Sequence, residues 1–434
     1  VQVLKGPQGT LFGRNTTGGA ILLVPAKPTD RLEGSIEGTI GNFDARRVQG
    51  VINIPLSDTF RVRAAVDRHK ADGYLRNRNE MGKSRLGDTD YIAARLSIVG
   101  DLTPDLENYT IFSYSRSNTN GVVPKYFACD TSPPAGTLAE ALAPLGCAQV
   151  ARAKARGDGF WDVDDHNPNA MERQEQWQVI NTTTWQASDN VTVKNIVSYA
   201  EFKQDTNFNL FGDSLLVPGA GGFRIPGLTI EDGATGKYAS QYTFTEELQI
   251  QGQTPNGVLN WQVGGYFESS KPLNYNSAYN NTFIDCIDAP SFNCTDPLGF
   301  GTISSANIKN SFTNIGLYAQ ATYKLTDKFS VTGGVRYTID RMKDQSRNIT
   351  AVIPTPGAPI FFCQNVAIFN QGSTAFPIFV DGPNSPTCDN VIKIKSEKPT
   401  WLINLDYKPT DDVLLYAKWA RGYRQGGIIS GNIG

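Results

Sequence analysis

The chain has 434 residues, 19% of them charged, and a formal net charge of −2. This near balance argues against a nucleic-acid partner, which usually requires a basic excess. No apolar run reaches the roughly 18 residues of a transmembrane helix, but a transmembrane β-barrel stays open, because its strands alternate between lipid and lumen.

The first segment, GPQGTLFGRNTTGGA at 6–20, is dense in glycine. A phosphate-binding loop needs G-x-x-x-x-G-K-[ST], and a dinucleotide fingerprint needs G-x-G-x-x-G. The spacing of Gly9 and Gly13, and Arg14 after them, match neither motif. Two explanations remain: a series of tight turns, or a backbone packed so closely against other protein that side chains would not fit.

The ends of the chain are abrupt. It begins with Val1 inside a β-like segment and ends at SGNIG without a closing element. We therefore expect an internal fragment of a longer protein, so that the lack of a signal peptide carries no information.

Short runs of alternating apolar and polar residues dominate the rest of the chain. FSVTGGVRYTID at 329–340, WLINLDY at 401–407 and FRVRAAVDR at 60–68 each have apolar residues at every second position, which is typical of strands with one apolar face. About thirteen such strands are predicted, at 31–41, 46–56, 60–71, 90–101, 107–117, 174–187, 190–205, 240–252, 257–270, 310–325, 328–343, 395–408 and 411–424. One short helix is expected within a loop, at 137–156.

Short and long connections alternate along the chain. Tight turns such as SDT, TPDLE, ASDN, TPNG, TDK and PTDD follow every second strand, and they are rich in turn-forming residues. The other connections are mostly long, at 72–89, 118–173, 206–239, 271–309 and 344–394. This alternation is typical of outer-membrane barrels, which have short periplasmic turns and long extracellular loops.

Aromatic residues mark the ends of the apolar stripes. Phe329 and Tyr337 lie eight positions apart, or roughly 27 Å along a strand. With a strand tilt of about 40° this spans about 20 Å, close to the apolar band of a membrane barrel. The sequence therefore predicts an all-β fold, a transmembrane antiparallel barrel with polar residues facing the lumen.

The six cysteines fall in pairs within the long loops. With no C-x-x-C motif and only His69 and His166 as histidines, no metal site is expected. An even number of loop cysteines favours disulfides in an oxidising compartment over free cytosolic thiols. Linking neighbours within one loop orders little chain, and this predicts Cys129–Cys147, Cys286–Cys294 and Cys363–Cys388; the sequence leaves other connectivities open.

The glycine-rich segment precedes the first barrel strand, and so many strands enclose a lumen too wide for side chains to fill. VQVLKGPQGTLFGRNTTGGAILLVPAKP, at 1–28, closely resembles the end of the plug domain of TonB-dependent outer-membrane receptors. FTEELQIQG at 244–252 and YAKWARGYRQGG at 416–427 resemble barrel-strand motifs of the same family.

The resemblance implies that 1–28 is the end of a plug and 31–434 the first part of a 22-stranded barrel, with about nine strands still to follow. It further implies a non-enzymatic importer in the bacterial outer membrane, driven by the TonB complex, without a cofactor. A ferric siderophore is the expected solute; cobalamin, a glycan or another metal chelate are alternatives.

Two other functions fit the sequence less well. A passive porin-like channel lacks a plug, which the first 28 residues resemble. A soluble secreted enzyme or glycan binder is not supported by any G-x-S-x-G or H-E-x-x-H motif. HNPNA at 166–170 resembles the Asn-Pro-Asn-Leu motif of haem receptors, but Ala170 replaces the leucine and histidines are scarce, so haem is not expected.

Aromatic residues in the long loops are the candidate solute contacts, although they could equally pack within the loops; they are Tyr126, Phe127, Trp161, Phe208 and Phe211. A plug–barrel contact is predicted between Arg14 and Glu247, since a charge in the lumen must be solvated or paired. The alternation also places Glu246 on the lipid side, which requires either a bulge or a position at the rim.

Overall fold

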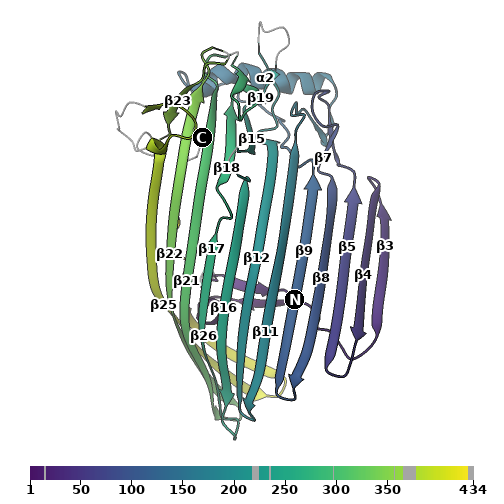
Figure 1. Ribbon diagram of the computed structural model, residues 1–434, viewed down its shortest axis with the longest axis vertical. Coiled ribbons are helices and arrows are strands. Elements are labelled where there is room, and N and C mark those ends of the chain that lie inside the picture. Colours follow the sequence, from purple (N-terminus) through teal and green to yellow (C-terminus); the bar gives the residue numbers. More distant parts are fainter. Residues whose placement is uncertain are drawn as a thin grey trace.

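The computed structural model describes residues 1–13, 16–217, 224–233, 236–296, 298–355, 357–364 and 378–428. One long antiparallel sheet curves into a barrel, with loops gathered at one end and short turns at the other (Figure 1). The predicted all-β barrel is therefore confirmed. No helix within the described residues has both the length and the apolar character needed to cross a membrane.

Each predicted barrel strand is present. The strands are β3 (Glu33–Gly41), β4 (Ala45–Pro55), β5 (Phe60–Ala71), β8 (Thr89–Thr103), β9 (Leu106–Thr119), β11 (Met171–Ser188), β12 (Val191–Asn209), β16 (Ala239–Gln253), β17 (Leu259–Lys271), β21 (Thr302–Thr326), β22 (Phe329–Val352), β25 (Asp389–Thr410) and β26 (Val413–Arg421).

Three strands extend well beyond their predicted ends. β21 begins at Thr302, β22 continues to Val352 and β25 begins at Asp389, so parts of the segments expected as loops are sheet. On β21 and β22 the extensions are mostly polar but also carry Ile303, Ile349 and Ala351, and the loops bury residues of both kinds. Polar and apolar residues are mixed on both faces of these extensions, so they show no alternation and the pattern could not reveal them.

Successive strands pair from β3 to β26 in antiparallel register. The order of neighbours is that of a closed barrel. Within the described residues, however, no register joins β26 to β3, and both strands are exposed along nearly their whole length. The hydrogen-bonded wall is thus continuous from β3 through β26.

The two faces of the wall differ sharply in exposure. Leu317 and Val335 point outward and are 67% and 53% exposed, whereas Arg336 and Thr338 point into the barrel and are 2% and 1% exposed. Outward aromatics form part of a girdle: the ring centres of Trp177 and Tyr199 are 5.3 Å apart. This arrangement fits an outside that contacts lipid.

The long loops contain structure of their own. Helix α2 (Leu138–Ala155) lies within the range expected for the loop helix. Its N-cap Thr137 accepts a hydrogen bond from the Glu140 amide, and Glu140 in turn accepts one from the Gly136 amide, which satisfies amides at the helix start. The remaining loop elements are β6 (Leu75–Asn77), β7 (Arg85–Leu86), β10 (Asp162–Val163), β13 (Leu215–Leu216), β14 (Arg224–Ile225), β15 (Leu228–Asp232), β18 (Asn276–Thr282), β19 (Asp285–Asp288), β20 (Asn293–Thr295), β23 (Ile360–Cys363), β24 (Phe379–Val380) and the 3-10 turn η2 (Pro386–Cys388).

The N-terminal segment is a hairpin inside the ring of strands (Figure 1). β1 (Gln2–Lys5) pairs with β2 (Gly19–Leu22), and the short helix α1 (Gly9–Phe12) lies between them. α1 contacts β21, β22 and β25. The segment thereby closes part of the lumen from within.

Candidate functional site

The glycines of the N-terminal segment lie where backbone meets the barrel wall. A Cβ added to Gly9 would lie 3.3 Å from Thr400 Cγ2, and one added to Gly13 would lie 3.0 Å from Arg336 Nη2. Gly13 also has a φ of 76°, which side chains rarely adopt. Gly18, by contrast, has open space around it. Of the two explanations that the sequence left open, close packing of the backbone against other protein therefore accounts for Gly9 and Gly13.

Arg336 is the wall residue against which this segment rests. Its Nε donates to Thr338 Oγ1 at 3.1 Å, and its guanidinium carbon lies 5.5 Å from the ring centre of Tyr318 and 5.6 Å from that of Tyr266. Stacking on aromatic faces is a favourable setting for a guanidinium. The room for Arg336 comes from Gly316, where any Cβ would lie 2.1 Å from Nη2.

Glu247 points into the lumen beside this cluster. Its Oε1 accepts a hydrogen bond from the Tyr318 hydroxyl at 2.5 Å. The expected partner, Arg14, lies outside the described residues, so their pairing stays a prediction. Glu247 is thus the carboxylate next to the Arg336–Tyr318 cluster.

The position of Glu246 differs from both expectations, a bulge or a place at the rim. β16 pairs with both neighbours without a register shift, so there is no bulge, and Glu246 lies mid-strand rather than at the rim. Its side chain is exposed on the outward face and accepts a hydrogen bond from Asn195 Nδ2 at 3.3 Å. The polar partner on β12 is what the alternation pattern could not show.

A cavity of about 830 Å³ opens along the lumenal wall of β4, β5, β8, β9, β11, β12 and β16. Its inward-facing lining is polar and includes Gln49, Asp67, Arg95, Gln176, Gln178 and Gln241. At its edge Arg47 makes a bidentate contact with Asp67, at 2.9 and 2.6 Å. Its volume is in the range of small-molecule sites, so the wall offers hydrogen-bonding groups to a solute in the lumen.

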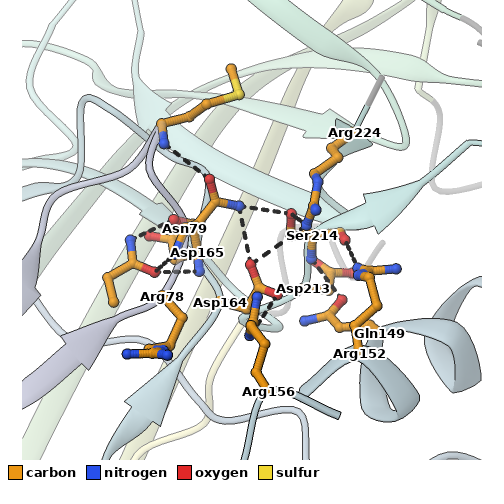
Figure 2. A network of polar contacts seen from close by, with 12 residues as sticks. Arg78, Asn79, Gln149, Arg152, Arg156, Asp164, Asp165, Asp213, Ser214 and Arg224 are labelled. Carbon is orange, nitrogen blue, oxygen red and sulfur yellow. Dashed lines mark hydrogen bonds and ion pairs between the residues drawn. The ribbon is translucent and has the colours of Figure 1, made fainter. Parts of the chain in front are cut away.

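Above the lumen, a polar network joins three long loops (Figure 2). Asp164 is its centre: Oδ2 accepts from Arg156 at 3.0 Å and Oδ1 accepts from Asn79 at 3.1 Å. Arg224 approaches Oδ1 at 3.7 Å, and Asn79 also donates to Ser214. Residues from loops far apart in sequence are thus held around one buried carboxylate.

Asp165 and His166 are buried next to this centre, 1% and 5% exposed. Burial raises the pKa of Asp165 to about 6. Burial, helped by the positive charge of Arg224, lowers the pKa of His166 to about 4. Both shifts favour the neutral form, because desolvation penalises the charge of either group. His166 is thus enclosed within the loops. The HNPNA segment therefore belongs to the buried part of the loops and supports their structure.

Helix α2 is tied to the same network. Gln149, 1% exposed, accepts from the Ser214 amide at 2.8 Å and donates to the Gly212 carbonyl at 3.3 Å. Arg152 donates to the Ser214 carbonyl at 2.8 Å. Leu145 of α2 packs with Leu215, Val217 and Ile225 in a small buried cluster. The helix is therefore held against residues 212–217 of the neighbouring loop.

The aromatic residues proposed as solute contacts differ in their surroundings. Trp161 is 57% exposed and lies edge-on to Tyr74 and Phe160. Tyr126 lies against Gly146 of α2, and Phe208 belongs to β12, opposite Ile230. Phe127 and Phe211 are 79% and 47% exposed. Trp161, Phe127 and Phe211 thus remain accessible, while Tyr126 serves packing within the loop.

Three disulfides lie in the loops, each within a single loop: Cys129–Cys147, Cys286–Cys294 and Cys363–Cys388. Cys294 also belongs to a buried apolar cluster with Tyr279, Ile284 and Phe292. Among the described side chains, no group of His, Cys, Asp and Glu is arranged to hold a metal ion.

The sequence analysis did not predict the loop network or the contact of Arg336 with the N-terminal segment. The acidic run DVDDH at 162–166 was the available signal for the first, but its arginine partners come from other loops. No local pattern signals Arg336, because its setting depends on strands β17, β21 and β22 meeting α1.

Comparison with known proteins agrees with this architecture. Residues 90–433 match the family model described as TonB dependent receptor-like, beta-barrel. The catecholate siderophore receptor Fiu of Escherichia coli K12 is 22% identical over 345 residues, which cover 77% of this chain and 42% of that protein. The chain therefore spans less than half the length of this curated relative.

Solved structures show the same fold. The ferric yersiniabactin uptake receptor FyuA from Yersinia pestis superposes with a TM-score of 0.65 at 16% identity, over 97% of this chain and 51% of that one. The siderophore receptor PiuA from Acinetobacter baumannii gives 0.60 at 16% identity, over 96% and 53%.

Members of this family are transporters rather than enzymes, and they reside in the bacterial outer membrane. The family model covers most of the chain, and the barrel wall with its lumenal hairpin is the fold of the similar structures. This chain therefore belongs to the TonB-dependent receptor family.

Proposed function

We propose that the protein carrying this chain imports a ferric siderophore across the outer membrane, driven by TonB. The observation that carries the proposal is the family barrel together with relatives that are named as siderophore receptors. Specificity would reside in the loops and the polar lumenal wall, and no bond of the solute is broken.

We further propose that 1–28 is the end of a plug domain and 31–434 part of the barrel. The hairpin of β1 and β2 lies within the ring of strands, and Lys418 of β26 donates to the Pro7 carbonyl at 3.1 Å. One side of the hairpin exposes Val1, Val3 and Ile21, an apolar surface suited to packing against more plug. A passive porin would have no use for such a segment.

Uptake in a deletion strain tests the solute. Cells lacking the protein receive it on a plasmid and are given radioactive iron as a ferric catecholate, radioactive cobalamin, or a labelled oligosaccharide. The proposal expects plasmid-dependent iron accumulation that disappears when TonB is deleted. Accumulation of cobalamin or glycan alone would replace the siderophore, and uptake that persists without TonB would indicate a passive channel.

A further inference from the structure

The outward face of the barrel carries a second charged feature, remote from the lumen. Arg341 and Lys343 of β22 lie directly opposite Lys395 and Lys393 of β25 in the strand register. Neighbouring strands are about 4.8 Å apart and alternate residues about 7 Å apart, so the four cations form a compact rectangle. We call these four residues the basic square.

The basic square points away from the lumen. On β22, exposed Val335, Tyr337 and Arg341 share one face, whereas Arg336, Thr338 and Asp340 on the other face are buried. On β25 the outward residues are Ile403, Lys395 and Lys393, with Thr400 and Leu402 buried on the lumenal side. A solute crossing the lumen therefore does not meet these four side chains.

Like charges face each other here with little compensation. Directly opposed like charges destabilise a strand pair, and two such pairs are stacked. Lys395 forms an ion pair with Glu397. In the part of the chain that the structure describes, Arg341, Lys343 and Lys393 form no ion pair. The arrangement holds a net charge that an external anion would neutralise.

A shallow cleft of about 290 Å³ accompanies the charges. The cleft is lined by the four basic residues together with Ser311 and Thr313 of β21, and by Met342 and Ile394. The two hydroxyls lie beside Lys343 and Arg341 in the register. Guanidinium, ammonium and hydroxyl donors on one side of a cleft are the groups that bind phosphate oxygens.

The level of the cleft relative to the membrane identifies the source of the phosphate. Arg341 lies four residues beyond the outward aromatic Tyr337 on the loop side of the barrel, or about 10 Å along the membrane normal at a tilt of about 40°. Aromatic belts sit at the membrane–water interface, so the basic square lies at the level of lipid headgroups. Free phosphate would need no such placement on the outer wall.

We propose that the basic square binds the phosphate groups of a phosphorylated lipid headgroup in the outer leaflet. The two opposed pairs span two strands, which suits a headgroup carrying more than one phosphate. The lipid would neutralise the repulsion between β22 and β25 and hold them together just below the long loops. This site is independent of the solute proposed above.

Native mass spectrometry of the detergent-solubilised full protein tests the site, with diphosphoryl lipid A as the probe. The variant Arg341→Gln/Lys393→Gln removes one cation from each opposed pair. Its matched control, Lys324→Gln/Lys408→Gln, removes the same charge from the turn ends of β21 and β25. The proposal expects binding to weaken about tenfold or more in the first variant and to stay within about twofold in the control.

Two further arms separate the sources of phosphate. Lipid A stripped of its phosphates should bind far more weakly than the diphosphoryl form, and inorganic phosphate should not displace the lipid at equal concentration. Equal losses in both variants, equal binding of the dephosphorylated lipid, or displacement by inorganic phosphate would each overturn the proposal. Heat-dependent gel mobility of each variant confirms that its barrel is folded.

Discussion

At the scale of single residues, Asp165 and His166 are neighbours whose buried side chains respond oppositely to pH. The unfolded histidine titrates near 6.5 and the folded one near 4, so its contribution to loop stability is lost as pH falls through this range. The unfolded aspartate titrates near 3.9 and the folded one near 6. Its contribution is present at low pH and is lost as pH rises through about 6.

Removing either group should therefore expose the effect of the other. Asp165→Asn leaves the acid-sensitive His166, and we expect the loop to lose stability between pH 6.5 and 4, on the order of 2 kcal/mol. His166→Asn should leave a loop that gains stability over the same range. Hydrogen exchange of 162–167, corrected for intrinsic rates, measures both, and identical pH profiles in the two variants would contradict the assignment. The charged neighbours Asp164, Asp213 and Arg224 are retained in both.

A substitution of Gly13 tests whether the N-terminal segment rests on Arg336. Gly13→Ala places a Cβ 3.0 Å from Arg336 Nη2 at a φ of 76°, and strain of about 1–3 kcal/mol is expected. Hydrogen exchange or protease cleavage within 1–24 should increase. Gly18→Ala, where nothing lies within 4 Å, is the control and should behave as the unmodified protein.

The predicted pair of Arg14 and Glu247 calls for a double-mutant cycle. If they interact, Arg14→Ala and Glu247→Ala each loosen the N-terminal segment, which we propose is the end of a plug, and the double variant is no worse than either one. Tyr318→Phe serves as a reference, because it removes only the hydroxyl that donates to Glu247. Additive losses from Arg14→Ala and Glu247→Ala, measured as plug accessibility, would show that the two side chains are independent.

At the scale of elements, Gln149 is one of the residues that attach α2 to the loop segment 212–217. Gln149→Ala leaves the Ser214 amide and the Gly212 carbonyl without their partners, and each such group costs about 1–3 kcal/mol when buried. We expect faster protease cleavage near 211–217 with the barrel intact. Lys154→Ala, on the exposed side of α2, should leave the cleavage rate unchanged.

Strands also differ in how well the sequence predicts them. The membrane-level parts of β22 and β25 carry alternating apolar residues, so period two revealed them. The upper part of β22 and loop strands such as β18 and β19 mix polar and apolar residues without alternation. They gain their strand conformation from pairing partners. Pairing across long sequence separations leaves no local period.

At the scale of the whole molecule, the orientation of the wall predicts the effect of charge. Leu317 faces outward and is 67% exposed, and Leu317→Arg at mid-membrane depth should destabilise the barrel by about 2–4 kcal/mol. Thr332→Arg on the lumenal face should be tolerated much better. The folded fraction in urea titrations with lipid vesicles measures both, and equal losses would mean that the faces are assigned wrongly.

The sequence by itself determined the barrel, the side on which the long loops lie, the likeness of 1–28 to a plug end and the family. These follow from alternation, turn composition and short motifs, all of which are local properties of a strand that separates lipid from water. The reach of Arg336 to Gly13, the contact of Glu246 with Asn195, the loop network around Asp164 and the basic square were decided only by the tertiary structure. Each depends on strand register, which brings together residues whose separation in the chain carries no record of their proximity.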